Sequence, residues 1–427
     1  MGKSESEIWK RIWSLKPEKE ELAPERMRIA LDLLGRPQEL FKSVLVLGEG
    51  RASASRLLSS LLGSYGISAG FFCPEAEDLS VCISAKGERI EEKRISDLFG
   101  ELENFLTLAE ERIEKEDLGK MGPLEALLCL SALEFSDEPV DVAVFEVSPG
   151  DGAEAYGALG AAGCIFTPLS QDAPAPLLAG LIGSKSFAVS SPQEEEAAFA
   201  LRQRAEDAGA LLMFDGEGLE VSEDLPAVGG QVADLSTPRG LYPQVPIKLF
   251  GDFQAHMALL ALAAGEGLIG EGKLEEDLVS EAFSTVKVPG SLRPVAQGPL
   301  TLASSASSEF EVGTVLKAAE ENFHPSPLVQ VVAPGKRFES AALPLLDRAS
   351  DLVIFAPDPS GEGPGAEELL NFARGFFTPG RAIVEESLQK ALEKGREIAL
   401  SSPSGSGGVM CLGGKGAFFG AEKAFRK

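Results

Sequence analysis

Apolar residues change their spacing near residue 40 of the chain. Across residues 27–34 they recur at i, i+3, i+4 and i+7, which predicts an amphipathic helix that ends at Gly35. Residues 43–47 then form an uninterrupted apolar run, Val-Leu-Val-Leu after Ser43, which is typical of a strand buried on both faces. The chain therefore opens with helices and continues into a central strand.

A glycine-containing loop and a second helix follow this first strand. The loop reads Gly48-Glu-Gly-Arg-Ala-Ser53, and leucines then recur on one side of residues 57–62. Strand, glycine loop and helix in this order are typical of a phosphate-binding βα unit. Further strands are predicted at residues 69–73, 140–147 and 164–167. Their alternation with helical stretches predicts a parallel α/β sheet.

A proline- and glycine-rich connector at residues 287–294 interrupts this alternation, which then restarts. Strands are predicted at 299–303, 328–333, 352–356 and 397–401, with a last apolar segment at 409–412. Helices are predicted at 309–323, 341–349, 366–377 and 384–394, and a flexible loop at 401–408. We therefore expect two α/β domains, residues 1–292 and 293–427, with a cleft between them.

Composition narrows the function classes. The 427 residues carry a net charge of −27, which disfavours binding to nucleic acid or to an anionic membrane surface. Five cysteines without a C-x-x-C pair predict reduced, buried thiols, and only two histidines, His256 and His324, are present. No apolar run reaches the ~18 residues of a membrane helix, and the acidic N-terminus is unlike a signal peptide. We expect a cytoplasmic monomer that binds neither nucleic acid nor membrane.

The order of these segments resembles the folylpolyglutamate synthase/dihydrofolate synthase family, which is of the Mur ligase type. The loop after residue 47 is similar to the family's G-T-N-G-K-G-S-T, and residues 140–147 to its v-D-x-a-V-l-E-v strand. Residues 249–258 are similar to its L-x-G-x-H-Q-x-x-N-A helix, and residues 288–292 to W-P-G-R-L. The resemblance implies a P-loop-like domain with a parallel sheet, followed by a Rossmann-like C-terminal domain. It also implies ATP and Mg²⁺ as cofactors, used to activate a carboxylate as an acyl phosphate that an amine attacks.

Carried over position by position, the resemblance identifies candidate site residues. The candidate nucleotide-binding residues are Gly48, Gly50, Arg51, Ser53 and Gln254. Ser53 and Glu146 are the candidate magnesium ligands. Two simpler interpretations stay open: the loop can be a tight βα turn inherited from a phosphate binder, and Glu146 a solvated carboxylate at a strand end.

Other positions depart from the family in its catalytic residues. Ala173 stands where the family has a metal-binding histidine, and Leu178 where it has a lysine that becomes carbamylated. Met257 replaces an adenine-facing asparagine, and Ser291 replaces the arginine of P-G-R. Residues 303–307 replace D-G-A-H-N with small residues, and Ala52 replaces a loop glycine.

These departures favour a family member whose ligase activity is impaired or absent. Under this hypothesis no residue is assigned a catalytic role, and the chain binds an unidentified small molecule or protein partner in the cleft between its domains. The alternative is an active ATP-dependent carboxylate–amine ligase with a rearranged site that uses Arg51, Ser53 and Glu146. A third possibility is a scaffold for protein interactions with a vestigial cleft.

Overall fold

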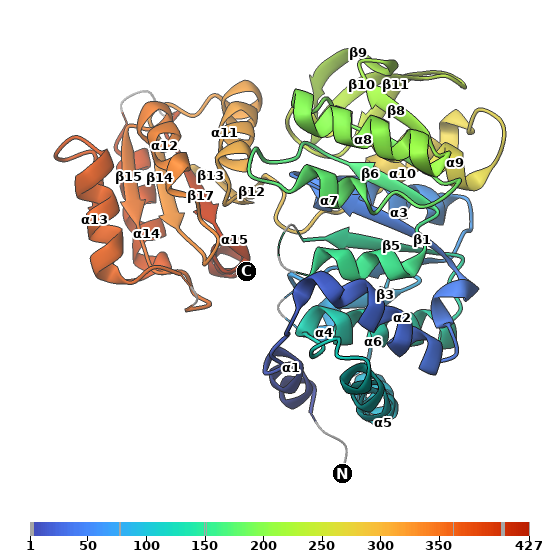
Figure 1. Ribbon diagram of the computed structural model, residues 1–427. Helices are drawn as coiled ribbons and strands as arrows, with labels where there is room; N and C mark the ends of the chain where they lie inside the picture. The colour runs from blue at the N-terminus through green and yellow to red at the C-terminus, as the bar shows by residue number, and fades with distance from the viewer. Residues whose placement is uncertain are drawn as a thin grey trace. The chain divides into compact units, whose positions relative to one another are not determined.

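The computed structural model describes residues 4–76, 78–148, 150, 152–361, 363–402 and 406–426. The chain forms two compact units (Figure 1). Unit 1 comprises Met1–Glu223, Asp234–Val245 and His256–Val286, and unit 2 comprises Asp224–Ala233, Pro246–Ala255 and Lys287–Lys427. The continuous part of unit 2 thus begins at Lys287, whereas the sequence places a boundary near residue 292.

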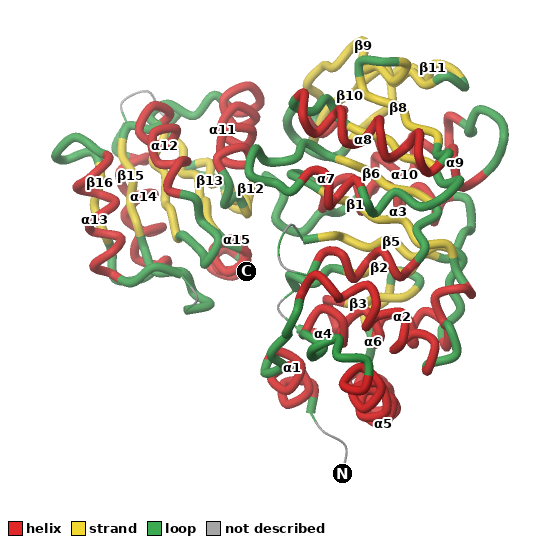
Figure 2. The backbone as a smooth tube through the Cα atoms, viewed as in Figure 1, coloured by secondary structure: helices red, strands yellow, loops and turns green. Residues whose placement is uncertain are grey.

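Strands and helices alternate along most of the chain (Figure 2). The first sheet contains β1 Lys42–Leu47, β2 Ala69–Phe72, β3 Ile83–Ala85, β4 Glu88–Arg89, β5 Val142–Val147, β6 Gly163–Phe166, β7 Phe187–Ser190, β8 Leu211–Asp215, β9 Gly218–Ala227, β10 Gly230–Thr237 and β11 Gly240–Ile247. The helices up to residue 286 are α1 Glu5–Trp13, α2 Ala23–Leu33, α3 Arg51–Ser64, α4 Leu79–Cys82, α5 Glu92–Lys115, α6 Pro123–Asp137, α7 Ala175–Ala179, α8 Glu195–Ala208, α9 Phe253–Ile269 and α10 Glu276–Thr285. The described residues also form the short 3₁₀ helices η1 Glu20–Leu22, η2 Pro37–Leu40, η3 Ala153–Leu159 and η4 Ser340–Ala342.

The first sheet has the strand order β11-β10-β9-β8-β7-β6-β1-β5-β2-β3-β4. Strands β2, β5, β1, β6, β7 and β8 pair in parallel, and β3 and β4 add an antiparallel edge. Because β1 is central, the loop that follows it lies at the carboxyl edge of the parallel strands, where such sheets bind ligands.

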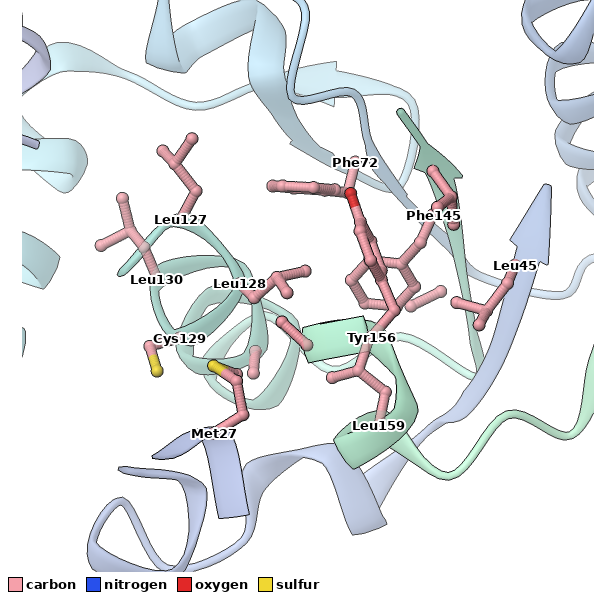
Figure 3. Close-up of a cluster of buried hydrophobic side chains, with 14 of the residues drawn as sticks. Met27, Leu45, Phe72, Leu127, Leu128, Cys129, Leu130, Phe145, Tyr156 and Leu159 are labelled. Carbon is pink, nitrogen blue, oxygen red and sulfur yellow. The ribbon is translucent and has the colours of Figure 1, made fainter. Parts of the chain in front are cut away.

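Aromatic side chains from neighbouring strands meet in the core of unit 1. Phe72 on β2 and Phe145 on β5 lie 5.7 Å apart between ring centroids, and Tyr156 of η3 contacts both (Figure 3). Met27 of α2 and Leu128 of α6 belong to the same buried cluster. These side chains hold α2, α6 and η3 against one face of the sheet and fix the position of β5.

Unit 2 contains a second sheet with helices on both faces. The remaining strands are β12 Arg293–Ala296, β13 Leu300–Ser305, β14 Leu328–Ala333, β15 Leu352–Phe355, β16 Ala382–Val384 and β17 Gly408–Gly413, in the order β12-β13-β17-β14-β15-β16. The remaining helices are α11 Glu309–Phe323, α12 Leu343–Ala349, α13 Ala366–Phe376, α14 Leu388–Leu400 and α15 Lys415–Phe425. One buried cluster joins α11, α12 and α13 to the sheet, and another joins α14 and α15. The protein is therefore α/β with two mixed, mostly parallel sheets, which confirms the predicted fold class.

One predicted element near residue 390 is displaced and another is wrong. The helix expected at 384–394 is present but begins at Leu388, after the unpredicted strand β16, and the strand expected at 397–401 is instead the last turn of α14, which ends at Leu400. Ser387 caps this helix by accepting a hydrogen bond from the amide of Lys390. Leu392 and Ala399, seven residues or about two helical turns apart, are both buried, while Leu400 is 62% exposed. The apolar residues at 398–400 therefore follow a helical rather than a strand pattern.

No helix in the described part of the chain is long and apolar enough to cross a membrane. The five cysteines, Cys73, Cys82, Cys129, Cys164 and Cys411, are all free and buried, as predicted. Burial raises the pKa of the Cys164 and Cys411 thiols to about 12, so neither has the thiolate character of a nucleophile.

Candidate functional site

The glycine loop after β1 is packed against the end of β6. Gly48 has φ +100°, and a Cβ at this position would lie 2.6 Å from the carbonyl oxygen and Oγ1 of Thr167. The Glu49 amide donates a 2.8 Å hydrogen bond to the Pro168 carbonyl, and the Thr167 hydroxyl donates a 2.7 Å bond to the Leu47 carbonyl. Gly48 is therefore required because of both backbone conformation and close approach.

The helix α3 begins directly after this loop. Gly50, its N-cap, has φ +76°, and the amide of Ser53 donates a 2.9 Å hydrogen bond to the Gly50 carbonyl. Ser53 is buried in the first turn. Four of the predicted residues, Gly48, Gly50, Arg51 and Ser53, thus lie in one loop and one helical turn.

The guanidinium of Arg51 is bonded within the protein. Its Nη1 donates a 3.1 Å hydrogen bond to the Gly48 carbonyl, and its Nη2 lies 2.5 Å from Oε1 of Glu75. The hydroxyl of Ser148 donates a 2.6 Å hydrogen bond to the same oxygen of Glu75. A carboxylate thus neutralises the cation that the sequence assigns to phosphate binding, and it would repel a phosphate placed there.

Glu146 on β5 is buried beneath α3, with 6% of its surface exposed. Its Oε1 accepts a 2.7 Å hydrogen bond from the Ser55 hydroxyl, and its backbone carbonyl accepts a 3.0 Å bond from the Tyr156 hydroxyl. The charge of Arg56 also attracts this carboxylate, although burial lowers the pKa of Arg56 from its ordinary value. This environment contradicts the interpretation of Glu146 as a solvated carboxylate.

The hydroxyl that contacts Glu146 belongs to Ser55, which the sequence analysis did not name. Ser53 and Ser55 are two positions apart on a helix and face different directions. Because no family motif marks Ser55, only the register of α3 over β5 could identify it.

Gln254 is grouped with unit 2, whereas the Gly48 loop belongs to unit 1. It lies in the first turn of α9 with 4% of its surface exposed, and no hydrogen-bond partner of its Oε1 is found among the described residues. On the same helix Met257 is buried, and the ring Nδ1 of His256 lies 2.5 Å from Oδ2 of the buried Asp215. The His256 side chain is 44% exposed, and its ring is held in place by the Asp215 carboxylate.

The residues that replace the family's catalytic side chains have structural contacts here, either apolar packing or a hydrogen bond to the backbone. Leu178 is 1% exposed in the core of unit 1, and Ala173 packs against the same cluster. In unit 2, β13 ends at Ser305, and the hydroxyl of Ser304 donates a 3.1 Å hydrogen bond to the Gly290 carbonyl. Within the described ranges, no three His, Cys, Asp or Glu side chains are grouped closely enough to hold a metal ion.

A strand–glycine loop–helix at the carboxyl edge of a parallel sheet, followed by a second α/β unit, is the architecture of ATP-dependent ligases of the Mur type. No family model matches the chain. It is 27% identical over 394 residues to the dihydrofolate synthase/folylpolyglutamate synthase of Mycobacterium tuberculosis, covering 86% of this chain and 81% of that protein.

The chain is also similar to solved structures of folylpolyglutamate synthases. The Mycobacterium tuberculosis folylpolyglutamate synthase complexed with ADP matches with a TM-score of 0.89 and 25% identity, covering 99% of this chain and 97% of that one. The synthases of Thermotoga maritima and Lactobacillus casei share the fold, each with a TM-score of 0.79 and 18% identity. These alignments cover 98% and 99% of this chain, and 96% and 100% of the other. The chain is thus similar in sequence, and over nearly its whole length in fold, to folylpolyglutamate synthase/dihydrofolate synthase proteins, which confirms the resemblance that the sequence predicts.

Proposed function

We propose that this chain is a folylpolyglutamate synthase-like protein without ligase activity, which binds a small molecule or a protein partner. The ion pair between Arg51 and Glu75 is the observation that carries this proposal. A P-loop cation contributes to catalysis by reaching the outer phosphates, and here the corresponding guanidinium is held by a carboxylate.

The residues present do not fit the ATP and Mg²⁺ that the family uses. One oxygen of Glu146 is engaged by Ser55, and the family's other metal-binding positions are Ala173 and Leu178. Neither an alanine nor a leucine can bind or bridge to a metal ion. Each lost electrostatic contact of this kind typically costs about 10²–10³ in rate, and several are lost together.

The test is an assay for the addition of glutamate to a reduced folate with ATP and Mg²⁺. We expect no product above background, and no thermal stabilisation by millimolar MgADP. A ligand present at 100 times its dissociation constant stabilises a native protein by ~2.7 kcal/mol, so specific binding would be readily detected. Glutamylated product at ordinary enzyme turnover would overturn the proposal and favour the rearranged ligase.

Native mass spectrometry of the freshly purified protein tests the binding part of the proposal and its expected monomeric state. A retained small molecule or co-purifying chain of defined mass would support it. A bare monomer that no folate stabilises would count against it.

A further inference from the structure

A pocket of about 350 Å³ lies between α3 and the β2–β3–β4 edge of the first sheet. Its lining includes Arg56, Ile67, Ser68, Phe71, Ser84 and Lys86. This volume is at the lower end of the range for small-molecule sites. The pocket follows α3 from Arg56 to its C-terminal end, and it contains none of the loop residues from Gly48 to Ser53.

The pocket has a basic lining in a strongly acidic protein. Its lining contains Arg56, Lys86 and three serines but no aspartate or glutamate, although the chain has 66 acidic and 39 basic residues. Arg89 adds a third positive charge, because it pairs with Ser84 across β3 and β4 and its charge lowers the pKa of Arg56 further.

The fold holds the two lining cations from opposite sides. The guanidinium carbon of Arg56 lies 3.5 Å from the centroid of the Phe71 ring, which restricts it to the face of β2. Lys86 and Gly87 form the two-residue turn between β3 and β4, with φ values of +55° and +81°. Such a turn is rigid, so it fixes the point from which the Lys86 side chain extends.

The carboxylates near the pocket do not prevent Arg56 and Lys86 from binding an anion. Lys86 lies 3.2 Å from Glu138, but both side chains are about half exposed, and such pairs contribute little. Asp141 accepts hydrogen bonds of 2.8 and 2.6 Å from the amide and hydroxyl of Ser68, which hold the pKa of this carboxyl below its ordinary value. Glu146 attracts Arg56 but receives its hydrogen bond from Ser55.

We propose that this pocket binds the phosphate group of a small molecule. A phosphate dianion matches three cations better than a carboxylate does, and its oxygens accept bonds from the Arg56 fork, Lys86 and the Ser84 hydroxyl. Ile67 and the methylenes of α3 offer contact to a short apolar body. The site uses neither the Gly48 loop nor Glu146 as a ligand, so it does not depend on the proposed loss of ligase activity.

Isothermal titration calorimetry at constant ionic strength tests this site with two probes, inorganic phosphate and phenyl phosphate. We expect saturable binding with a stoichiometry of one. Lys86→Asn weakens the affinity for both probes about tenfold, and asparagine is chosen because it tolerates the left-handed backbone of the turn. The matched control is Lys185→Asn, since Lys185 is also exposed and has φ +55°, and it leaves the affinity unchanged. Arg56→Gln abolishes binding, and Arg56→Lys retains part of it.

The probes also distinguish the source of the phosphate. Tighter binding of phenyl phosphate supports an organic phosphate ester, whereas equal affinities support free phosphate as the ligand of the same site. Absence of saturable heat, an equal loss in Lys86→Asn and Lys185→Asn, or a loss caused only by Arg51→Gln would overturn the proposal. Because Lys86 lies in an exposed turn, its variant decides the question even where Arg56→Gln does not fold.

Discussion

Arg26 of α2 and Glu125 of α6 form a buried, bidentate ion pair. Nε and Nη2 of Arg26 lie 2.8 and 3.2 Å from the two oxygens of Glu125, and the arginine is 0% exposed. Nη1 lies 2.8 Å from each of the carbonyl oxygens of Glu18, Lys19 and Leu118, which share its two N–H donors. One side chain therefore joins the N-terminal segment, α2 and the start of α6.

Replacing this arginine by methionine is expected to destabilise the protein by about 3–5 kcal/mol, because the buried carboxylate of Glu125 loses the positive charge that compensates it. Three backbone carbonyls lose their donor as well. Urea denaturation measures the loss. Arg28→Met is the control, since Arg28 lies on the same helix but is 61% exposed, and it should change stability by less than about 0.5 kcal/mol. Equal stability of the two variants would show that the buried pair contributes nothing.

A second prediction concerns Glu75, the carboxylate that holds Arg51. Glu75→Gln removes a negative charge from the Gly48 loop and frees the guanidinium, so the affinity for MgADP should rise by at least about tenfold, from no detectable stabilisation of the wild-type protein to a measurable one. Thermal stabilisation by millimolar MgADP measures the gain. Glu217→Gln is the control, because Glu217 pairs with Arg202 at an exposed site. Unchanged nucleotide affinity in Glu75→Gln would show that another feature of the loop prevents binding.

Sequence patterns predicted several of the buried elements closely. The helix expected at 309–323 and the strand at 328–333 have the bounds of α11 and β14, since each combines a clear period with flanking turn residues. The strands from β7 to β11 were not predicted. β9 is largely solvated, with Leu225 57% exposed, and β10 is mostly buried but carries Gln231, Asp234 and Thr237 among its apolar residues, so no continuous apolar run marks either strand.

The candidate site was predictable only where a motif is local. Gly48, Gly50, Arg51 and Ser53 follow one another in the chain, so the family pattern locates them together. Glu75 lies 24 residues from Arg51 and Ser55 lies 91 residues from Glu146, and no spacing rule connects such pairs. The contacts that decide what the loop can bind depend on the tertiary fold.

Leu178 offers a third prediction, because the family has a lysine at this position. Here the side chain is 1% exposed in the core of unit 1, so Leu178→Lys buries a charge without a partner. We expect destabilisation on the order of 3 kcal/mol and no gain of ligase activity. Leu178→Met preserves volume and polarity, and it should cost less than about 1.5 kcal/mol. A lysine tolerated as well as methionine would mean that this position opens to solvent, which would favour the rearranged ligase.

Glu266 on α9 predicts a specific pH dependence of stability. It is 2% exposed, and its Oε1 accepts hydrogen bonds of 2.7 Å from the Tyr242 hydroxyl and 2.9 Å from the Thr237 hydroxyl. Desolvation raises the pKa of this carboxyl above its ordinary value, and the two hydroxyls, with the charges of Arg239 and Lys273, offset the rise only in part.

The folded state therefore holds the Glu266 proton more tightly than the unfolded state does. The tighter binding of this proton contributes to the free energy of unfolding. The contribution is fully present below the ordinary glutamate pKa of about 4.3, and it is lost as the pH rises through the raised pKa. Glu266→Gln cannot ionise, so the variant should gain stability relative to the wild-type protein across that window, by ~1.4 kcal/mol for every tenfold difference in proton affinity between the two states. Denaturant midpoints from pH 4 to 8 measure the difference. Glu217→Gln, at an exposed site, should show almost none, and a pH-independent difference for Glu266→Gln would mean that its carboxyl titrates alike in both states.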